Sequence, residues 1–178
     1  MISDSTPLLA HPLDVPSAFK PEDLMQAVRA ERGLTAASVP PLCVLDFDGD
    51  LSDGLMRDGA ASLSQSWPCF HTQMVVLTLD GIECGVVPRT IGGPYAVLVA
   101  EQLHAGGAQL IVGLTSAGRV APTLPLPSIV VVEEAIRDEG TSLHYLPEST
   151  TVACPTPALA QHLARELETL SPVRRGPV

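Results

Sequence analysis

From residue 90 onward, the sequence alternates between segments that favour helix and segments that favour strand, and this alternation constrains the fold more than any other feature. A glycine turn at 90–93 leads to Pro94, which suits the first turn of a helix, and the helical pattern ends at 106–107. Apolar runs follow at 108–114 and 129–132. Such runs are typical of strands that a mainly parallel sheet buries on both faces. We therefore expect an α/β fold with a central mixed, mainly parallel sheet flanked by helices.

Two further strands are predicted upstream as a hairpin. The β-rich runs 74–79 and 82–87 are separated by Asp80-Gly81, and an Asp-Gly pair is a common two-residue hairpin turn. Before them, the apolar run 43–47 leads into Asp48-Gly49-Asp50. This pattern predicts a strand followed by a glycine loop.

One helix is predicted near each end of the chain. Pro21 suits the first position of a helix that Gly33 would end, and we expect this helix to lie at the surface or to face a partner. Near the C-terminus, Thr156 and Pro157 suit the start of a helix. A leucine stripe at helical spacing, formed by Leu159, Leu163, Leu167 and Leu170, also predicts this helix.

These patterns give a domain organisation. We expect residues 1–41 to be an N-terminal segment with one helix and residues 42–178 to be an α/β domain. Residues 171–178 stand where the alternation requires another strand, so we expect the domain to be incomplete at its C-terminus and an apolar sheet edge to be uncovered. Soluble monomers rarely expose large apolar patches. We therefore expect a homo-oligomer, most simply a two-fold dimer.

Charge and hydropathy exclude several classes of partner. The formal net charge is -10, and Lys20 is the only lysine. Binding to nucleic acid or to anionic membrane surfaces requires clustered basic residues, so we expect neither partner. No apolar run reaches the roughly 20 residues that span a bilayer, and the N-terminus does not have the pattern of a signal peptide. The cytoplasm is the expected compartment.

The cysteines do not suggest a metal site or a disulfide framework. They are widely spaced, without a Cys-x-x-Cys pair or a Cys/His cluster. We expect no bound metal and four buried or half-buried free thiols, at Cys43, Cys69, Cys84 and Cys154.

Three loops rich in glycine or small polar residues follow predicted strands. They contain Gly49, the pair Gly92-Gly93, and the run from Thr115 to Gly118. Such loops expose backbone N–H groups and hydroxyls, and open α/β sheets bind ligands at the carboxyl ends of their strands. Each loop alone is also compatible with an ordinary turn, whereas the three together predict a pocket for a polar ligand.

Several of these segments carry a family resemblance. The residues Ile91-Gly92-Gly93-Pro94, the run from Gly113 to Gly118, Ala121-Pro122-Thr123-Leu124 and the run from Ala135 to Tyr145 resemble the nucleoside phosphorylase superfamily. That superfamily includes uridine phosphorylases, purine nucleoside phosphorylases and methylthioadenosine nucleosidases. The resemblance covers about residues 43–170. It implies a three-layer α/β/α sandwich, oligomeric assembly, and cleavage of the N-glycosidic bond of a nucleoside by phosphorolysis or hydrolysis. It implies no cofactor, although phosphate can act as a co-substrate.

The resemblance also assigns roles to individual residues. It places Gly49 on the anion side of the pocket and Ser116 beside phosphate or ribose, while Ala117 and Gly118 border the sugar and the base. The expected substrate-binding residues are Gly49, Gly92, Gly93, Thr115, Ser116, Ala117 and Gly118.

The sequence departs from the family where phosphorylases hold phosphate with arginines. At these positions stand Asp53, Gly113, and Phe70 or His71. Guanidinium groups are the strongest phosphate clamps, so their loss favours water over phosphate as the acceptor. The arginines that could compensate are Arg57, Arg89 and Arg119, and each also suits an ordinary surface position; Arg89 and Arg119 are the candidate anion contacts.

Catalytic residues cannot be assigned from this resemblance. In the family, the glutamate that binds the ribose hydroxyls and the residue that protonates the base lie beyond the position matching residue 178. His11 lies in a region from which relatives send a histidine to a neighbour's ribose, but it also suits an exposed position. Two functions therefore stand: a nucleoside-cleaving enzyme, or a truncated or diverged homologue that binds a ligand or partner without catalysis.

Overall fold

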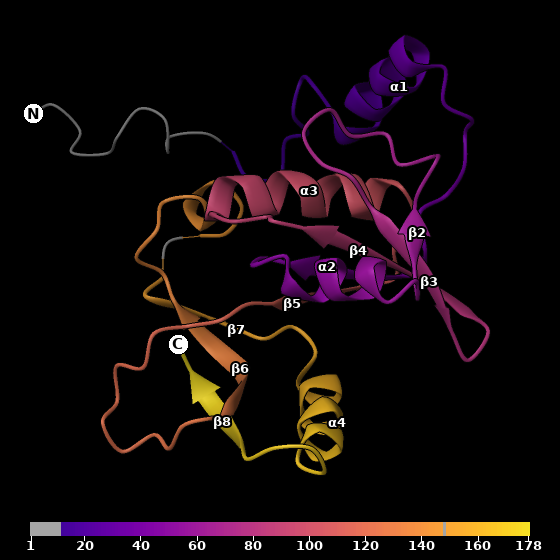
Figure 1. The fold of residues 1–178 in the computed structure, drawn as a ribbon. Helices are drawn as coiled ribbons and strands as arrows, with labels where there is room; N and C mark the ends of the chain where they lie inside the picture. Colours follow the sequence, from indigo (N-terminus) through magenta and orange to yellow (C-terminus); the bar gives the residue numbers. More distant parts are fainter. Residues whose placement is uncertain (1–11, 148) are drawn as a thin grey trace, which may run out of the picture. The chain divides into compact units, whose positions relative to one another are not determined.

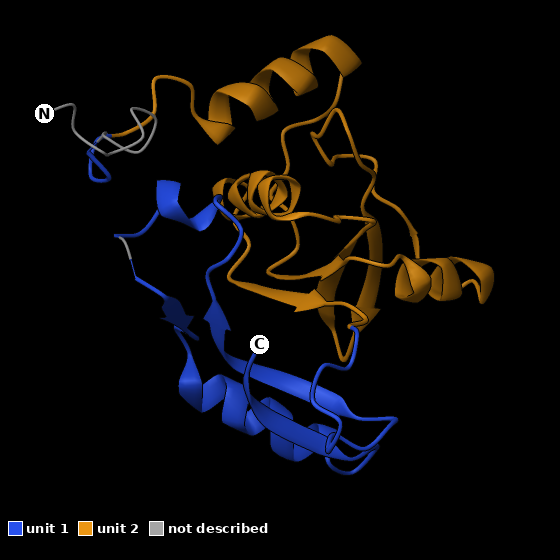
Figure 2. Cartoon of the chain, turned by 90° about the vertical axis from the view of Figure 1, so that its left-hand side faces the viewer, with its two compact units in different colours: residues 1–15, 118–178 blue, residues 16–117 orange. Residues whose placement is uncertain are grey.

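The computed structural model describes residues 12–147 and 149–178, so His11 lies outside the described residues. The chain divides into two compact units (Figure 2). What we call the first unit is residues 16–117, which is orange and labelled unit 2 in the figure; the second unit is residues 118–178 together with 12–15, which is blue and labelled unit 1. We describe each unit by itself. The boundary between residues 41 and 42 that the sequence suggests stays a prediction.

The first unit contains a five-stranded mixed sheet in the order β2-β3-β4-β1-β5. Its strands are β1 (Leu42–Asp46), β2 (Ser62–Leu63), β3 (Val75–Leu79), β4 (Ile82–Pro88) and β5 (Leu110–Leu114). Strand β1 is parallel to both β4 and β5, whereas β2-β3 and β3-β4 are antiparallel. β5 was expected to be buried on both faces, but it is an edge strand of this sheet and is half-buried to exposed.

The hairpin predicted around Asp80-Gly81 is present. Leu79 pairs with Ile82, so Asp80 and Gly81 form a two-residue loop. Their φ angles are 49° and 82°. Positive φ at both central residues is characteristic of a type I′ turn, whose twist matches that of the flanking strands.

Two helices cover opposite faces of this sheet (Figure 1). Leu45 of β1 belongs to the same buried cluster as Val99 and Leu103 of α3 (Gly93–Ala105). The next residue, Asp46, hydrogen-bonds to Ser52 of α2 (Asp50–Arg57). Because successive side chains of a strand point to opposite faces, α3 and α2 lie on either side of the sheet. These elements form a three-layer α/β/α arrangement.

Helix α1 (Pro21–Arg32) has the bounds that the sequence predicts, and Gly33 ends it with a φ of 65°. The helix contacts α3 and buries Met25 and Val28, which are 1% and 0% exposed. Its apolar side is therefore covered within its own unit, and only its polar remainder is available to a partner.

The second unit contains a three-stranded sheet and one helix. The strands β6 (Ile129–Ile136), β7 (Thr151–Ala153) and β8 (Val173–Pro177) are arranged in the order β7-β6-β8. β8 is parallel to β6 and lies within 171–178, where the alternation of helix and strand requires another strand. Its Val-Arg-Arg-Gly-Pro sequence has little strand propensity, and pairing with β6, including an ion pair between Arg175 and Glu133, overrides that preference.

Helix α4 (Pro157–Leu167) begins as predicted and buries two alanines. Ala160 and Ala164 are the buried residues, with exposures of 7% and 2%, whereas Leu159, Leu163 and Leu170 are exposed. The helix packs on β6 and β8 through Val131 and Val173, and alanines at the contact permit a close approach. The predicted helix is therefore present, and of its leucine stripe Leu167 packs against this cluster.

Candidate functional site

Three loops meet at one edge of the five-stranded sheet because β4, β1 and β5 are adjacent and parallel. The loop after β1 carries Gly49, the loop after β4 begins with Arg89, and the loop after β5 carries Ser116. This is the carboxyl edge, where open α/β sheets place their ligands. Gly49 and Ser116 thus lie at one edge together with Arg89, while their role in substrate binding stays a prediction.

A buried carboxylate shapes the first loop. Asp46 is 2% exposed and accepts hydrogen bonds from the backbone N–H of Gly49 at 3.1 Å and of Ser52 at 2.9 Å. It also accepts a 2.7 Å hydrogen bond from the Ser52 hydroxyl. These three bonds connect the end of β1 to the first turn of α2. Gly49 is the N-cap residue of this helix and has a φ of 90°.

Arg89 lies directly against Gly49. Its own φ is 57°, and its backbone N–H donates to the carbonyl of Asp46 at 2.7 Å. The φ of Gly49 is one that other residues rarely adopt, so the backbone conformation favours glycine; a Cβ there would lie 3.0 Å from Arg89 Cζ and would require the Arg89 side chain to shift. Arg89 Nη2 donates to Asp53 Oδ2 at 2.6 Å, and the two side chains are 57% and 54% exposed.

Ser116, in the loop after β5, is hydrogen-bonded to the loop after β1. Its backbone N–H donates to Asp48 Oδ2 at 2.5 Å, across 68 residues of sequence. The adjacent Thr115 hydroxyl donates to the Ser116 carbonyl at 3.0 Å. Thr115, Ser116 and Ala117 follow β5 in the unit that holds Gly49.

The remaining predicted residues lie outside this contact network. Gly92, with a φ of 99°, caps α3, and Gly93 begins that helix; a Cβ on Gly92 would have no neighbour within 4 Å. Gly118 and Arg119 belong to the other unit, where Arg119 Nη1 donates to the carbonyl of Leu124 at 3.1 Å. Arg119 therefore has a partner of its own there, while Arg89 is the predicted anion contact that lies beside Gly49.

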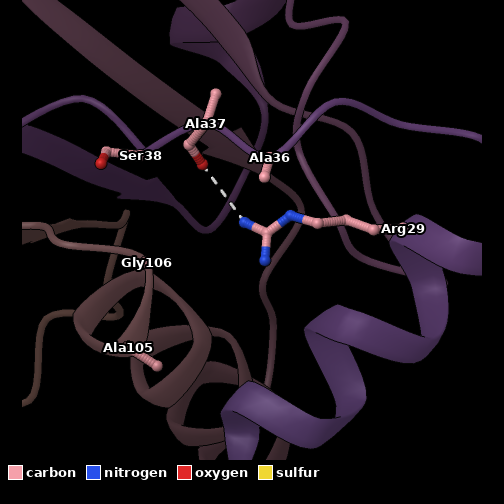
Figure 3. A pocket seen from close by; sticks show the side chains of 6 residues that line it. All are labelled: Arg29, Ala36, Ala37, Ser38, Ala105 and Gly106. Carbon is pink, nitrogen blue, oxygen red and sulfur yellow. Dashed lines mark hydrogen bonds between the residues drawn. The ribbon is translucent and has the colours of Figure 1, made fainter.

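A separate cavity of about 300 Å³ lies where the ends of α1 and α3 meet the segment that precedes β1 (Figure 3). Its lining residues are Arg29, Ala36, Ala37, Ser38, Ala105 and Gly106. Arg29 Nη2 donates to the carbonyl of Ala37 at 3.2 Å. Helices α1 and α3 both end here, and carbonyls at helix C-termini favour a cation such as this guanidinium. Arg29 therefore has a structural role, because it connects the end of α1 to the segment that contains Ala37.

The run from Ala135 to Tyr145 is held by side-chain hydrogen bonds within the run and to Pro147 and Ser149. Arg137 donates to the Ser142 hydroxyl at 2.8 Å, to the Ser149 hydroxyl at 2.9 Å and to the carbonyl of Pro147. Ser142 in turn donates two hydrogen bonds to Glu139, and these bonds lower the pKa of the Glu139 carboxyl. This part of the motif is a structural network around a 3₁₀ turn, Ser142–His144.

Sequence reasoning missed the two aspartates that organise the site. The sequence pattern predicts only a strand and a glycine loop around Asp46 and Asp48, and it assigns neither residue to the site. An available signal was the placement of Asp46 at the last position of an apolar strand, where a carboxylate can accept hydrogen bonds from the first turn of a following helix.

Residues 12–147 and 149–178 contain neither a metal-binding cluster nor a membrane-spanning helix. No group of three or more histidine, cysteine, aspartate and glutamate side chains there is arranged to hold a metal ion. In the same residues, no helix has the length and apolar character needed to cross a bilayer.

Comparison with known proteins gives the family. The model of the phosphorylase superfamily matches residues 56–178, which is more than half of the chain. The chain belongs to the phosphorylase superfamily.

Curated relatives from this comparison match over part of their length. An uncharacterized protein of Acanthamoeba polyphaga mimivirus is 34% identical over 71 residues, which are 40% of this chain and 29% of that protein. A uridine phosphorylase of Thermococcus kodakarensis is 32% identical over 66 residues, 37% of this chain and 24% of the relative. The chain thus matches less than a third of each of these proteins.

Solved structures show that the fold is that of nucleoside phosphorylases. Uridine phosphorylase of Vibrio fischeri superimposes with a TM-score of 0.68 at 21% identity, over 79% of this chain and 58% of that chain. Purine nucleoside phosphorylase of Toxoplasma gondii, solved with immucillin-H, gives 0.67 at 20% identity, over 79% and 56%. These structures confirm the expected sandwich fold, and the family model confirms the expected superfamily.

Proposed function

We propose that this chain carries the sugar and acceptor side of a nucleoside-binding pocket in an enzyme that cleaves N-glycosidic bonds. The observation that supports it most is the meeting of Gly49, Arg89 and Ser116 at the carboxyl ends of three adjacent parallel strands. Membership of the phosphorylase superfamily supplies the substrate class. The compounds named with its structural neighbours are small molecules, immucillin-H among them.

The chemistry of the bond sets what such a pocket must provide. As the bond to the base breaks, the sugar gains positive charge, and an acceptor must attack it while the base gains a proton. Asp48 and Asp53 bring negative charge to the edge where Gly49 and Ser116 lie. A carboxylate nearby stabilises a developing cation. The candidate contacts here are the backbone of Gly49 and the hydroxyl of Ser116.

We assign water as the acceptor, so that cleavage is hydrolysis. The resemblance expects phosphate-binding arginines where Asp53, Gly113, and Phe70 or His71 stand. Phosphorolysis is the other outcome, and phosphate would then be the co-substrate. We also propose that the protein forms a homo-oligomer in the cytoplasm and has no nucleic-acid partner.

Base release from a panel of purine and pyrimidine nucleosides tests the activity. The 178-residue chain is incubated with each nucleoside in phosphate-free buffer and in phosphate buffer of equal ionic strength. We expect release of the free base and free ribose at the same rate in both buffers. Strict dependence on phosphate would overturn the assignment of water.

The second candidate function is a module that binds a nucleoside, or a partner protein, without cleaving it. It is favoured because Asp53, Gly113, and Phe70 or His71 stand where the resemblance expects arginines that hold phosphate. Calorimetry separates the two functions: nucleoside binding without base release supports the module, and turnover by this chain excludes it.

A further inference from the structure

Hydrogen-bond donors at the carboxyl edge of the sheet are engaged by carboxylates of the chain itself. The edge has the ingredients of an oxyanion site: the N-terminus of α2, a backbone N–H at Ser116 and the guanidinium of Arg89. Asp46 accepts hydrogen bonds from the N–H groups of Gly49 and Ser52. Asp48 accepts one from the N–H of Ser116, and Asp53 accepts one from Nη2 of Arg89.

These aspartates differ in what they do. Asp46 is buried, and its bonds build the turn after β1. Asp48 and Asp53 are exposed at the edge, and each meets a donor on a different strand loop. Because Asp48 and Asp53 are exposed, they do not contribute to core packing. Their hydrogen bonds instead occupy donors that a bound ligand could use.

We propose that Asp48 and Asp53 are specificity-determining residues that exclude phosphate and other oxyanions from this edge. Asp48 occupies the Ser116 N–H, and Asp53 neutralises Arg89 and holds its guanidinium over Gly49. An incoming phosphate would have to displace both carboxylates or bind beside them against their charge. A neutral acceptor meets no such repulsion.

This role of Asp48 and Asp53 rests on the proposed function, which makes the carboxyl edge the acceptor side of a nucleoside pocket. Phosphate binding itself can be tested without a nucleoside. The probe is inorganic phosphate, titrated into the chain against sodium chloride of equal ionic strength. The readout is the backbone amide resonance of Ser116, together with the other amides of the edge. The variants are Asp48→Asn, Asp53→Asn and the double variant.

We expect no saturable shift in the unaltered chain up to about 100 mM phosphate, which corresponds to a negligible binding free energy. A carboxylate about 5 Å from a phosphate dianion lowers affinity roughly five- to tenfold in a screened aqueous setting. Each single variant should therefore gain about that factor, and the double variant should show saturable binding at Ser116. Asp58→Asn is the matched control, because it makes the same change in net charge at the other end of α2.

Saturable phosphate binding by the unaltered chain would overturn the proposal. An equal gain in Asp58→Asn, or no gain in the folded double variant, would do the same. Because the Asp53 side chain is half exposed, Asp53→Asn alone tests the charge effect if substitution of Asp48 disturbs the loop. Base release is measured in a separate experiment. If the proposed activity is not found, the phosphate titration still shows whether Asp48 and Asp53 exclude phosphate.

Discussion

Replacing Asp46 by alanine should destabilise the first unit more than any other aspartate substitution at the carboxyl edge. Asp46 is 2% exposed and accepts three hydrogen bonds, from the Gly49 and Ser52 N–H groups and the Ser52 hydroxyl. The variant leaves two buried N–H groups without an acceptor. Each unsatisfied buried group costs about 1–3 kcal/mol, so we expect a loss of about 3 kcal/mol in the free energy of unfolding.

Urea denaturation followed by tryptophan fluorescence measures this loss directly. Trp67 is the single tryptophan and is 5% exposed in the core of the first unit, so its emission reports on that unit. With an m-value of about 2 kcal/mol/M, the midpoint should fall by roughly 1.5 M urea. Ser52→Ala removes only the hydroxyl bonds and should cost about 1 kcal/mol. Asp58→Ala, at the far end of α2, is the control.

A loss below about 1 kcal/mol for Asp46→Ala, or a loss equal to that of Asp58→Ala, would refute the reasoning. Either result would mean that solvent or another acceptor serves the Gly49 and Ser52 amides, and that the turn does not depend on this carboxylate.

Three further outcomes are expected. In thiol labelling of the native chain, Cys154 should react first, because burial raises the pKa of the Cys43 thiol to about 11; rapid labelling of Cys43 at neutral pH would contradict this. Gly85→Ala should cost about 1–2 kcal/mol, since its Cβ would lie 2.9 Å from Sδ of the buried Met74, whereas Gly54→Ala in α2 has open space and should stabilise; equal effects in urea denaturation would contradict the packing. Light scattering should give at least twice the 18.7 kDa chain mass, and a monomer would refute the proposed oligomer.

Sequence patterns predict the parts of this fold that local chemistry determines. The bounds of α1 follow from Pro21 and Gly33, and the hairpin follows from Asp80-Gly81 between two β-rich runs. In these cases the signal lies within a few residues of the structure that it specifies, so no knowledge of the tertiary fold is needed.

Features decided by distant contacts could not be predicted in this way. Strand β8 exists because β6 provides a pairing edge more than 40 residues earlier, and α4 buries Ala160 and Ala164 because the sheet beneath it favours a close approach. In the candidate site, the glycine and serine loops were identified, but their partners were not. The bond from Ser116 to Asp48 spans 68 residues, and no local pattern encodes it.

The most direct test of the central claim is to map a nucleoside on the chain by amide chemical-shift perturbation. Purine and pyrimidine nucleosides are titrated in phosphate-free buffer, and the backbone amides are followed individually. We expect saturable shifts at Gly49, Ser116 and Ala117, at the carboxyl edge of the five-stranded sheet. Shifts confined to the cavity beside Arg29 and Gly106, or no saturable shift with any nucleoside, would contradict the proposed binding site.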